Sequence, residues 1–150
     1  MDKKTEFDSA IKDAMKSGDE VRKRTLRMVM AAIKQIEVDR RVSLDEAGVL
    51  SILQKEIKLR KEALEEAKRA NRADLAADAQ AEIDVLSAFL PQSLSADELR
   101  TLVQTAITET GAASPADLGR VMKALLPQVA GRAPGDQVSA LVRELLQNKQ

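Results

Sequence analysis

Apolar residues recur every three or four positions along nearly the whole chain, and no stretch shows the sustained alternation that is typical of a β-strand. This spacing predicts a helix over residues 3–16 and a second helix that begins after Asp19. Ser43 and Glu46 have the spacing of a capping box, which predicts the start of a third helix, and a fourth helix then runs to about Ala88. The residues expected to face inward include Phe7, Ile11, Ala14, Met15, Thr25, Met28, Val29, Ile36, Leu53, Ile57, Leu64, Leu75, Ile83 and Leu86.

The clearest boundary is the segment 89–95, in which Pro91 removes a backbone donor and stops the preceding helix. We therefore expect two domains, residues 1–92 and residues 93–150. A capping box at Ser95 and Glu98 starts the second domain. Further helix ends or starts are predicted at Gly111, Pro115, Pro127 and Pro134. The sequence thus predicts an all-α protein, with an N-terminal helical domain of four longer helices followed by a small three-helix C-terminal domain.

The chain of 150 residues contains two phenylalanines and no Tyr, Trp, Cys or His. So few aromatic residues disfavour a β-sandwich or barrel. Without Cys and His there is no disulfide framework and zinc would find only carboxylate ligands, so we expect neither a metal nor a cofactor. The apolar runs are too short for a signal peptide core or a membrane span, which predicts a cytoplasmic protein without a membrane partner.

The 24 basic and 24 acidic residues cancel, but they are unevenly distributed. Residues 1–42 hold 11 basic and 8 acidic residues, and residues 55–72 hold 7 and 4, whereas residues 73–110 hold 1 and 7. This asymmetry bears on the choice of partner more than the net charge does. It leaves two classes of partner open, a polyanion such as RNA for the basic segments and a basic protein for the acidic segment.

The second predicted helix carries a basic stripe. Five residues fall within an arc of about 100° on this helix, namely Lys23, Arg24, Arg27, Lys34 and Arg41. Such a stripe attracts phosphate backbones. The alternative is a solvated face, because Glu20 lies four residues before Arg24, a spacing at which opposite charges pair on a helix. Glu37 and Arg41 have the same spacing, so both interpretations stay open.

Other charged residues predict a solvated surface and no catalytic site. The pairs Glu56–Arg60 and Glu65–Arg69 have helical spacing and are expected to stabilise an exposed helix. The acidic residues of the fourth helix are likewise expected to face solvent, including Asp78, Glu82 and Asp84. Nucleophilic catalysis needs an activated Ser, Cys or Lys beside a base, and no such arrangement is recognisable, so no catalytic residue is assigned.

Residues 119–138 hold two of the four prolines and three of the six glycines. The stretch lacks the glycine and lysine spacing of a P-loop. It predicts a corner between two helices, in which Gly131 and Gly135 supply unusual backbone angles. A second interpretation also stays open, in which a phosphate is held by three basic residues, Arg120, Lys123 and Arg132.

Several blocks resemble the YqeY-like family, namely LRMVMAAIKQIEVDRR, LQKEIKLRKEALEEAKRANRADL, FLPQSLS, DLGRVMKAL and VAGRAPGDQV. Residues 95–150 are similar to the tail domain of the B subunit of the glutamine-dependent aspartyl/glutamyl-tRNA amidotransferase, with matches at Gly119, Met122, Lys123, Gly131 and Arg132. The resemblance implies an all-α fold with a larger N-terminal helical domain and a three-helix tail. Because that tail contacts the tRNA body in the enzyme, the resemblance implies that Arg120, Lys123 and Arg132 contact a tRNA backbone. Asp136 departs from the basic or amide residue of many relatives.

Three hypotheses about function result. The first is a non-catalytic accessory protein that binds tRNA or a protein of tRNA aminoacylation or amidation, with Arg120, Lys123 and Arg132 on the phosphates and Arg24, Arg27 and Lys34 assisting. The second is a protein–protein adaptor that docks through residues 73–110 without RNA. The third is an enzyme, because the family is often described as having carbon–nitrogen ligase activity with glutamine as amido donor. That description is inherited from a multidomain enzyme whose nucleotide and aminoacyl-tRNA sites have no counterpart in this sequence.

Overall fold

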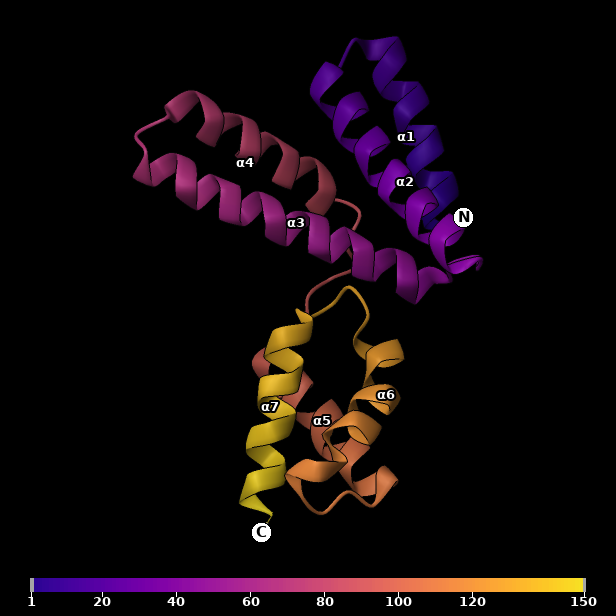
Figure 1. The fold of residues 1–150 in the computed structure, drawn as a ribbon, viewed down its shortest axis with the longest axis vertical. Helices are drawn as coiled ribbons and strands as arrows, with labels where there is room; N and C mark the ends of the chain where they lie inside the picture. The colour runs from indigo at the N-terminus through magenta and orange to yellow at the C-terminus, as the bar shows by residue number, and fades with distance from the viewer. Residues whose placement is uncertain (1, 150) are drawn as a thin grey trace. The chain divides into compact units, whose positions relative to one another are not determined.

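The structure, a computed structural model, describes residues 2–149, and the regular secondary structure of these residues is entirely helical (Figure 1). In chain order the elements are α1 (Lys3–Ser17), α2 (Glu20–Arg40), α3 (Glu46–Arg69), α4 (Ala73–Ser87), α5 (Ala96–Thr110), the short 3₁₀ helix η1 (Pro115–Asp117), α6 (Leu118–Val129) and α7 (Gly135–Asn148). Helices α1–α4 pack together in an N-terminal unit that ends at Leu90. Helices α5–α7 form a C-terminal unit that starts at Pro91. The predicted all-α fold is confirmed, and the boundary after residue 92 stays a prediction.

Polar side chains fix the starts of two helices as the sequence predicts. The Asp19 carboxylate accepts a hydrogen bond from the backbone N–H of Arg22 (3.1 Å) at the start of α2. At the start of α5, Ser95 and Glu98 exchange backbone-to-side-chain hydrogen bonds of 3.1 and 3.2 Å, which is a complete capping box. Each cap satisfies a backbone donor that the first turn of a helix leaves unpaired.

The capping box predicted at Ser43 and Glu46 is wrong. Helix α3 is capped by Asp45, whose carboxylate accepts a hydrogen bond of 2.8 Å from the backbone N–H of Gly48. A carboxylate directly before the first helical residue reaches this donor, so the helix begins later than a cap at Ser43 requires.

The core of the N-terminal unit is built around the two phenylalanines. Phe7 and Phe89 are buried, and their rings meet edge to face with centroids 5.0 Å apart, as expected for core residues. The guanidinium group of Arg22 lies 5.6 Å from the Phe89 ring centroid. The large aliphatic residues of this unit that are also fully buried are Leu26, Val29, Ile33, Leu53 and Leu86.

Three residues that the helical pattern places inward are exposed instead. Met15, Met28 and Leu75 keep 55%, 51% and 47% of their surface accessible. Each lies at the edge of an apolar stripe, where periodicity alone does not decide how wide a face the neighbouring helices cover.

The C-terminal unit has its own core, which α5, α6 and α7 share. Pro127 does not stop α6 as predicted, because the helix continues to Val129, and both Leu125 and Val129 are buried against the neighbouring helices. A proline this close to the helix end removes only one backbone hydrogen bond. In the corner that follows, Gly131 has a φ of 73°, whereas Gly135 starts α7 without a positive φ, so the prediction for Gly135 is wrong.

Candidate nucleic-acid interface

Helix α6 turns two of the predicted basic residues toward solvent. Arg120 and Lys123 are exposed and lie one turn apart, whereas Val121 and Leu125 point into the core. The Arg120 guanidinium lies 3.2 Å from the carboxylate of Asp117. Within residues 2–149 the Lys123 ammonium group forms no ion pair or hydrogen bond. Lys123 is therefore the uncompensated charge of this face.

Asp117 is a fixed anion, because the backbone N–H groups of Ala113 and Ser114 donate to its carboxylate and lower its pKa, with the charge of Arg120 adding less. Asp117 forms a capping box with Ser114 at the start of η1. Arg120 thus keeps one partner and has donors left for a ligand, since a guanidinium carries five N–H groups.

Gly119 leaves the backbone of α6 uncovered beside these cations. Its φ lies outside the left-handed region, and a Cβ at this position would meet no atom within 4 Å. A glycine inside a helix is less favourable than alanine by about 0.5–1 kcal/mol. Neither backbone geometry nor space in the C-terminal unit requires a glycine here.

Arg132, the third of the predicted basic residues, has contacts different from those of Arg120 and Lys123. It follows the far end of α6, and Arg120 lies about 14 Å before that end along the helix axis. The Arg132 Nε donates to the carbonyl of Gln92 (3.2 Å), and its own carbonyl accepts from the N–H of Leu94 (2.9 Å). These two bonds hold the segment before α5 against the corner, which is a structural role that the sequence did not indicate.

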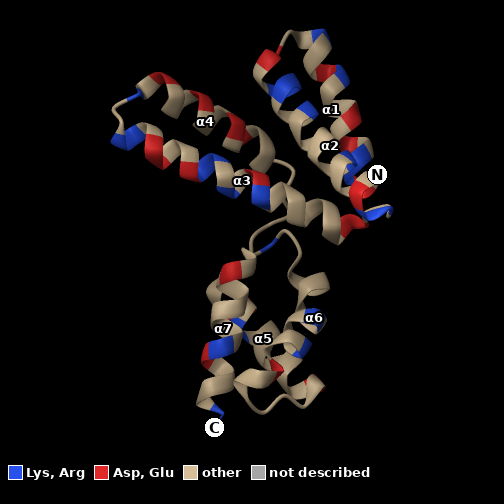
Figure 2. Cartoon of the chain, viewed as in Figure 1, with Lys and Arg blue, Asp and Glu red and all other residues tan. Residues whose placement is uncertain are grey.

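The basic stripe of α2 lies in the N-terminal unit (Figure 2), and its three predicted contact residues have different surroundings. Arg24 pairs with Glu82 of α4 at 3.5 Å, and the Arg27 guanidinium lies 3.5 Å from the sulfur of Met15. Lys34 is exposed and forms no ion pair with any described residue. The stripe therefore retains positive charge on the exposed side of the helix.

The local pairs expected to neutralise this stripe are not those observed. Glu20 pairs with Lys23 at 2.8 Å, and Glu37 pairs with Lys4 of α1. The Lys4 ammonium group and the N–H of Leu44 donate to the Glu37 carboxylate and hold its pKa below the usual range. Glu37 therefore fastens α1 and the segment before α3 to α2.

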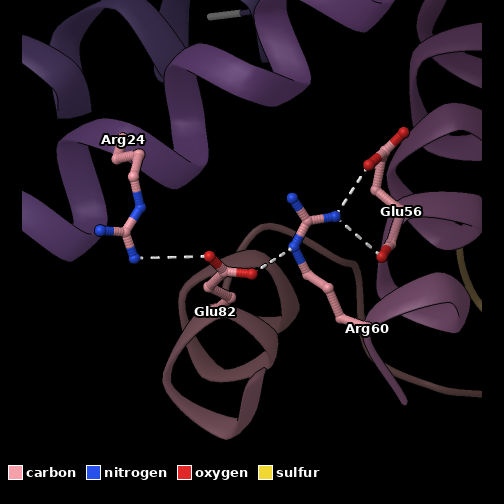
Figure 3. Close-up of polar contacts among 4 residues, drawn as sticks. All are labelled: Arg24, Glu56, Arg60 and Glu82. Carbon is pink, nitrogen blue, oxygen red and sulfur yellow. Dashed lines mark hydrogen bonds and ion pairs between the residues drawn. The ribbon is translucent and has the colours of Figure 1, made fainter. Parts of the chain in front are cut away.

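A buried charge cluster inside the N-terminal unit is the feature that sequence reasoning missed (Figure 3). Arg60 of α3 is only 7% exposed. Its Nη1 donates to the Glu56 carboxylate (2.8 Å) and to the Glu56 carbonyl (3.0 Å), and its Nε donates to Glu82 (3.0 Å). Glu82 also contacts Arg24, so the cluster joins α2, α3 and α4.

The prediction that Arg60 and Glu82 lie on solvated faces is therefore wrong. Arg60 stands between Ile57 and Leu64 at the spacing of the buried seam of α3, and this position was the available signal. The predicted Glu56–Arg60 pair does form, whereas Glu65 pairs with Lys68 at 3.7 Å in place of Arg69.

Residues 2–149 contain neither a recognisable metal site nor a membrane-spanning helix. No group of three or more potential metal-ligating residues is found there, and no helix is long and apolar enough to cross a membrane. Two shallow hollows of about 390 Å³ lie at the α3–α4 turn near Asn71 and between α5 and α7 near Leu99.

Comparison with known proteins matches residues 4–146 to the model of a family described as Yqey-like protein. The protein named "Altered inheritance of mitochondria protein 41, mitochondrial" from Lachancea thermotolerans is 32% identical over 108 residues, which are 70% of this chain and 58% of that protein. A protein of the same name from Pyrenophora tritici-repentis is 28% identical over 141 residues, covering 91% of this chain and 76% of that protein. An uncharacterized protein from Schizosaccharomyces pombe is 34% identical over 83 residues, which are 55% of this chain and 68% of that protein. The chain thus spans less than two thirds of the Lachancea protein.

Proposed function

Because the chain belongs to the YqeY-like protein family, we propose that it is a non-catalytic accessory protein that binds tRNA through the exposed face of α6. The observation that carries the proposal is the pair of Arg120 and Lys123, one turn apart beside the uncovered backbone of Gly119. Two cations at this spacing attract neighbouring phosphates and release counterions when they bind. The missing side chain at Gly119 lets a phosphate backbone come close to the helix.

The chemistry of the surface favours recognition of phosphates and shape over recognition of bases. Single-strand binding that tolerates any sequence normally uses exposed aromatic rings on which bases stack. Phe7 and Phe89 are the only aromatic residues of the chain, and both are buried in the N-terminal unit. A folded RNA with closely spaced phosphates, such as tRNA, is the ligand that suits such a surface.

Arg132 has a supporting role in this proposal. Its Nε is committed to the Gln92 carbonyl, and replacing it would loosen the segment before α5. A loss of binding on substitution of Arg132 would therefore mix a structural effect with a lost contact. Lys123 is free of this ambiguity, because it is exposed on α6 and forms no ion pair or hydrogen bond with a described residue, whereas Arg120 has one local contact, its ion pair with Asp117.

The experiment that tests the proposal is fluorescence anisotropy with labelled bulk tRNA at low salt. We expect Arg120→Gln/Lys123→Gln to weaken binding at least about tenfold, because two phosphate contacts are lost. The matched control is Arg100→Gln/Arg143→Gln, which removes the same charge from exposed positions on α5 and α7. Equal loss in both double variants would reduce the effect to net charge, and absence of tRNA binding by the wild type would refute the proposal.

The alternative adaptor function through residues 73–110 has less support. Asp74 is bound to Arg72 by two hydrogen bonds of 3.1 and 2.9 Å, and Glu82 belongs to the buried cluster, so part of the acidic segment is already neutralised. The carbon–nitrogen ligase description of the family requires turnover of glutamine, and we propose that this chain has none by itself. The cytoplasmic location stays a prediction, since two of the relatives are named mitochondrial proteins.

A further inference from the structure

The exposed face of α2 carries large apolar side chains among its basic residues. Met28 and Val38 on α2 are 51% and 63% exposed, and Met15 on the adjacent α1 is 55% exposed. The Arg27 guanidinium rests 3.5 Å from the Met15 sulfur, so the apolar and basic groups form one surface. Four of the seven large exposed hydrophobic residues among the described positions lie within residues 15–42.

The charge along the middle of this face has one sign. Residues 21–36 contain five basic residues and no Asp or Glu. Among the acidic residues near this face, Glu20 pairs with Lys23 and Glu82 of α4 pairs with Arg24. Asp39 keeps its charge at the C-terminal end of α2, where its carboxylate accepts a hydrogen bond of 2.8 Å from Gln35. Arg27 and Lys34 in the middle of the face have no acidic partner among the described residues.

We propose that this α2 face, formed by Arg24, Arg27, Met28, Lys34 and Val38 with Met15 of α1, docks an acidic amphipathic helix of a partner protein. From Arg24 to Val38 the face runs for about 21 Å, or about four helical turns, which is long enough to receive a helix of similar length. Methionine side chains adapt to varied apolar partners. The carboxylates flanking the apolar stripe of such a helix would meet the guanidinium of Arg27 and the ammonium of Lys34.

The same face is poorly suited to the other occupants. A phosphate backbone would use the basic groups but leave Met28 and Val38 in water, and no aromatic ring is exposed there for a base to stack on. A second copy of the chain with its α2 face opposed would bring like charges together, which is unfavourable. Complementarity of both charge and apolar surface favours the acidic helix.

The test uses the full chain labelled with ¹³C in the methionine methyl groups, and NMR reports on each methyl separately. The probe is a synthetic amphipathic helical peptide of about 16 residues with leucine on one face and glutamate on the other. We expect saturable shifts at Met15 and Met28 and none at Met122, which lies in the C-terminal unit. The variant Arg27→Glu/Lys34→Glu is expected to lower the affinity for the peptide at least about tenfold, because the attraction between these residues and the glutamates of the peptide becomes repulsion.

Two controls distinguish this interface from non-specific attraction. Lys55→Glu/Lys61→Glu makes the same change in net charge at exposed positions of α3 and is expected to leave the affinity within about twofold, since these residues are not part of the α2 face and salt weakens the interaction between exposed charges that are not in contact. A peptide with lysine in place of glutamate is expected not to bind. The proposal is overturned if the acidic peptide leaves Met15 and Met28 unmoved, if both charge reversals act equally, or if the lysine peptide binds as well. It is also overturned if the methyl signals of Met15 and Met28 shift on addition of tRNA and not on addition of the peptide. The same holds if these signals shift on dilution of the protein alone, which would indicate self-association.

Discussion

The buried charge cluster around Arg60 makes the sharpest prediction about stability. The Arg60 side chain is 8% exposed, and those of Glu56 and Glu82 are 20% and 19% exposed. Removing the counter-charges of a buried ion costs about 3–5 kcal/mol. Because both glutamates are partly hydrated and glutamine keeps an acceptor oxygen, we expect Glu56→Gln/Glu82→Gln to cost about 3 kcal/mol, at the lower end of this range.

A third substitution separates charge burial from packing. Arg60→Met in the double-glutamine background replaces the stranded cation with an apolar side chain of similar length, so most of the lost stability should return. The matched control is Glu62→Gln/Glu66→Gln, since these carboxylates are exposed on the same helix. We expect the control to change the free energy of unfolding by less than about 0.5 kcal/mol.

The assay is native-state amide hydrogen exchange of α3 and α4, which reports the opening free energy of the N-terminal unit by itself. Global unfolding curves are less suitable, because two contact units need not unfold in one transition. If the double variant loses less than about 1 kcal/mol, or if Arg60→Met fails to restore stability, burial of an unpaired arginine is not the cause and the reasoning is refuted.

Three further predictions concern single positions. Thr25→Val is expected to raise the opening free energy of α2 by about 1 kcal/mol in native-state hydrogen exchange, because the buried Thr25 hydroxyl has no hydrogen-bond partner among the described residues; a loss of stability would imply a partner. Gly119→Ala should stabilise the chain by about 0.5–1 kcal/mol yet lower its affinity for tRNA, measured by fluorescence anisotropy. An unchanged affinity would exclude a close approach of the RNA backbone to α6 at this position. Glu37→Gln should lower the opening free energy of α2 in native-state hydrogen exchange at neutral pH but not in acid. The reason is that the pKa of Glu37 is lowered, so its contribution to stability is present above the unfolded-state pKa and is lost as the pH falls through the folded-state pKa. An equal difference at both pH values would contradict the Lys4 contact.

The helical periodicity and the caps at Asp19 and Ser95 were sufficient to predict the all-α fold, because both are local properties of the sequence. The errors occur where a choice depends on tertiary contacts. Pro127 does not end α6, since burial of Val129 outweighs one missing backbone hydrogen bond. Which of Ser43 and Asp45 caps α3 likewise depends on where the chain leaves α2.

The candidate site was predictable in part. Exposure of Arg120 and Lys123 follows from the position of Val121 and Leu125 on α6, and periodicity gives it correctly. The engagement of Arg132 with the Gln92 carbonyl spans 40 positions in sequence, so no local pattern indicates it. The same holds for the contact that Glu82 makes with both Arg24 and Arg60, because it joins three helices.

The measurement that tests the central claim most directly is the salt dependence of tRNA binding, compared between the wild type and Arg120→Gln/Lys123→Gln. Each duplex phosphate contact contributes about 0.9 to the slope of log affinity against log salt, so between about 50 and 200 mM salt the double variant should show a slope shallower by about 1.8. Our account predicts this change and a slope unchanged in Arg100→Gln/Arg143→Gln. An identical slope in the wild type and the α6 variant would contradict it, because the phosphates would then be held elsewhere.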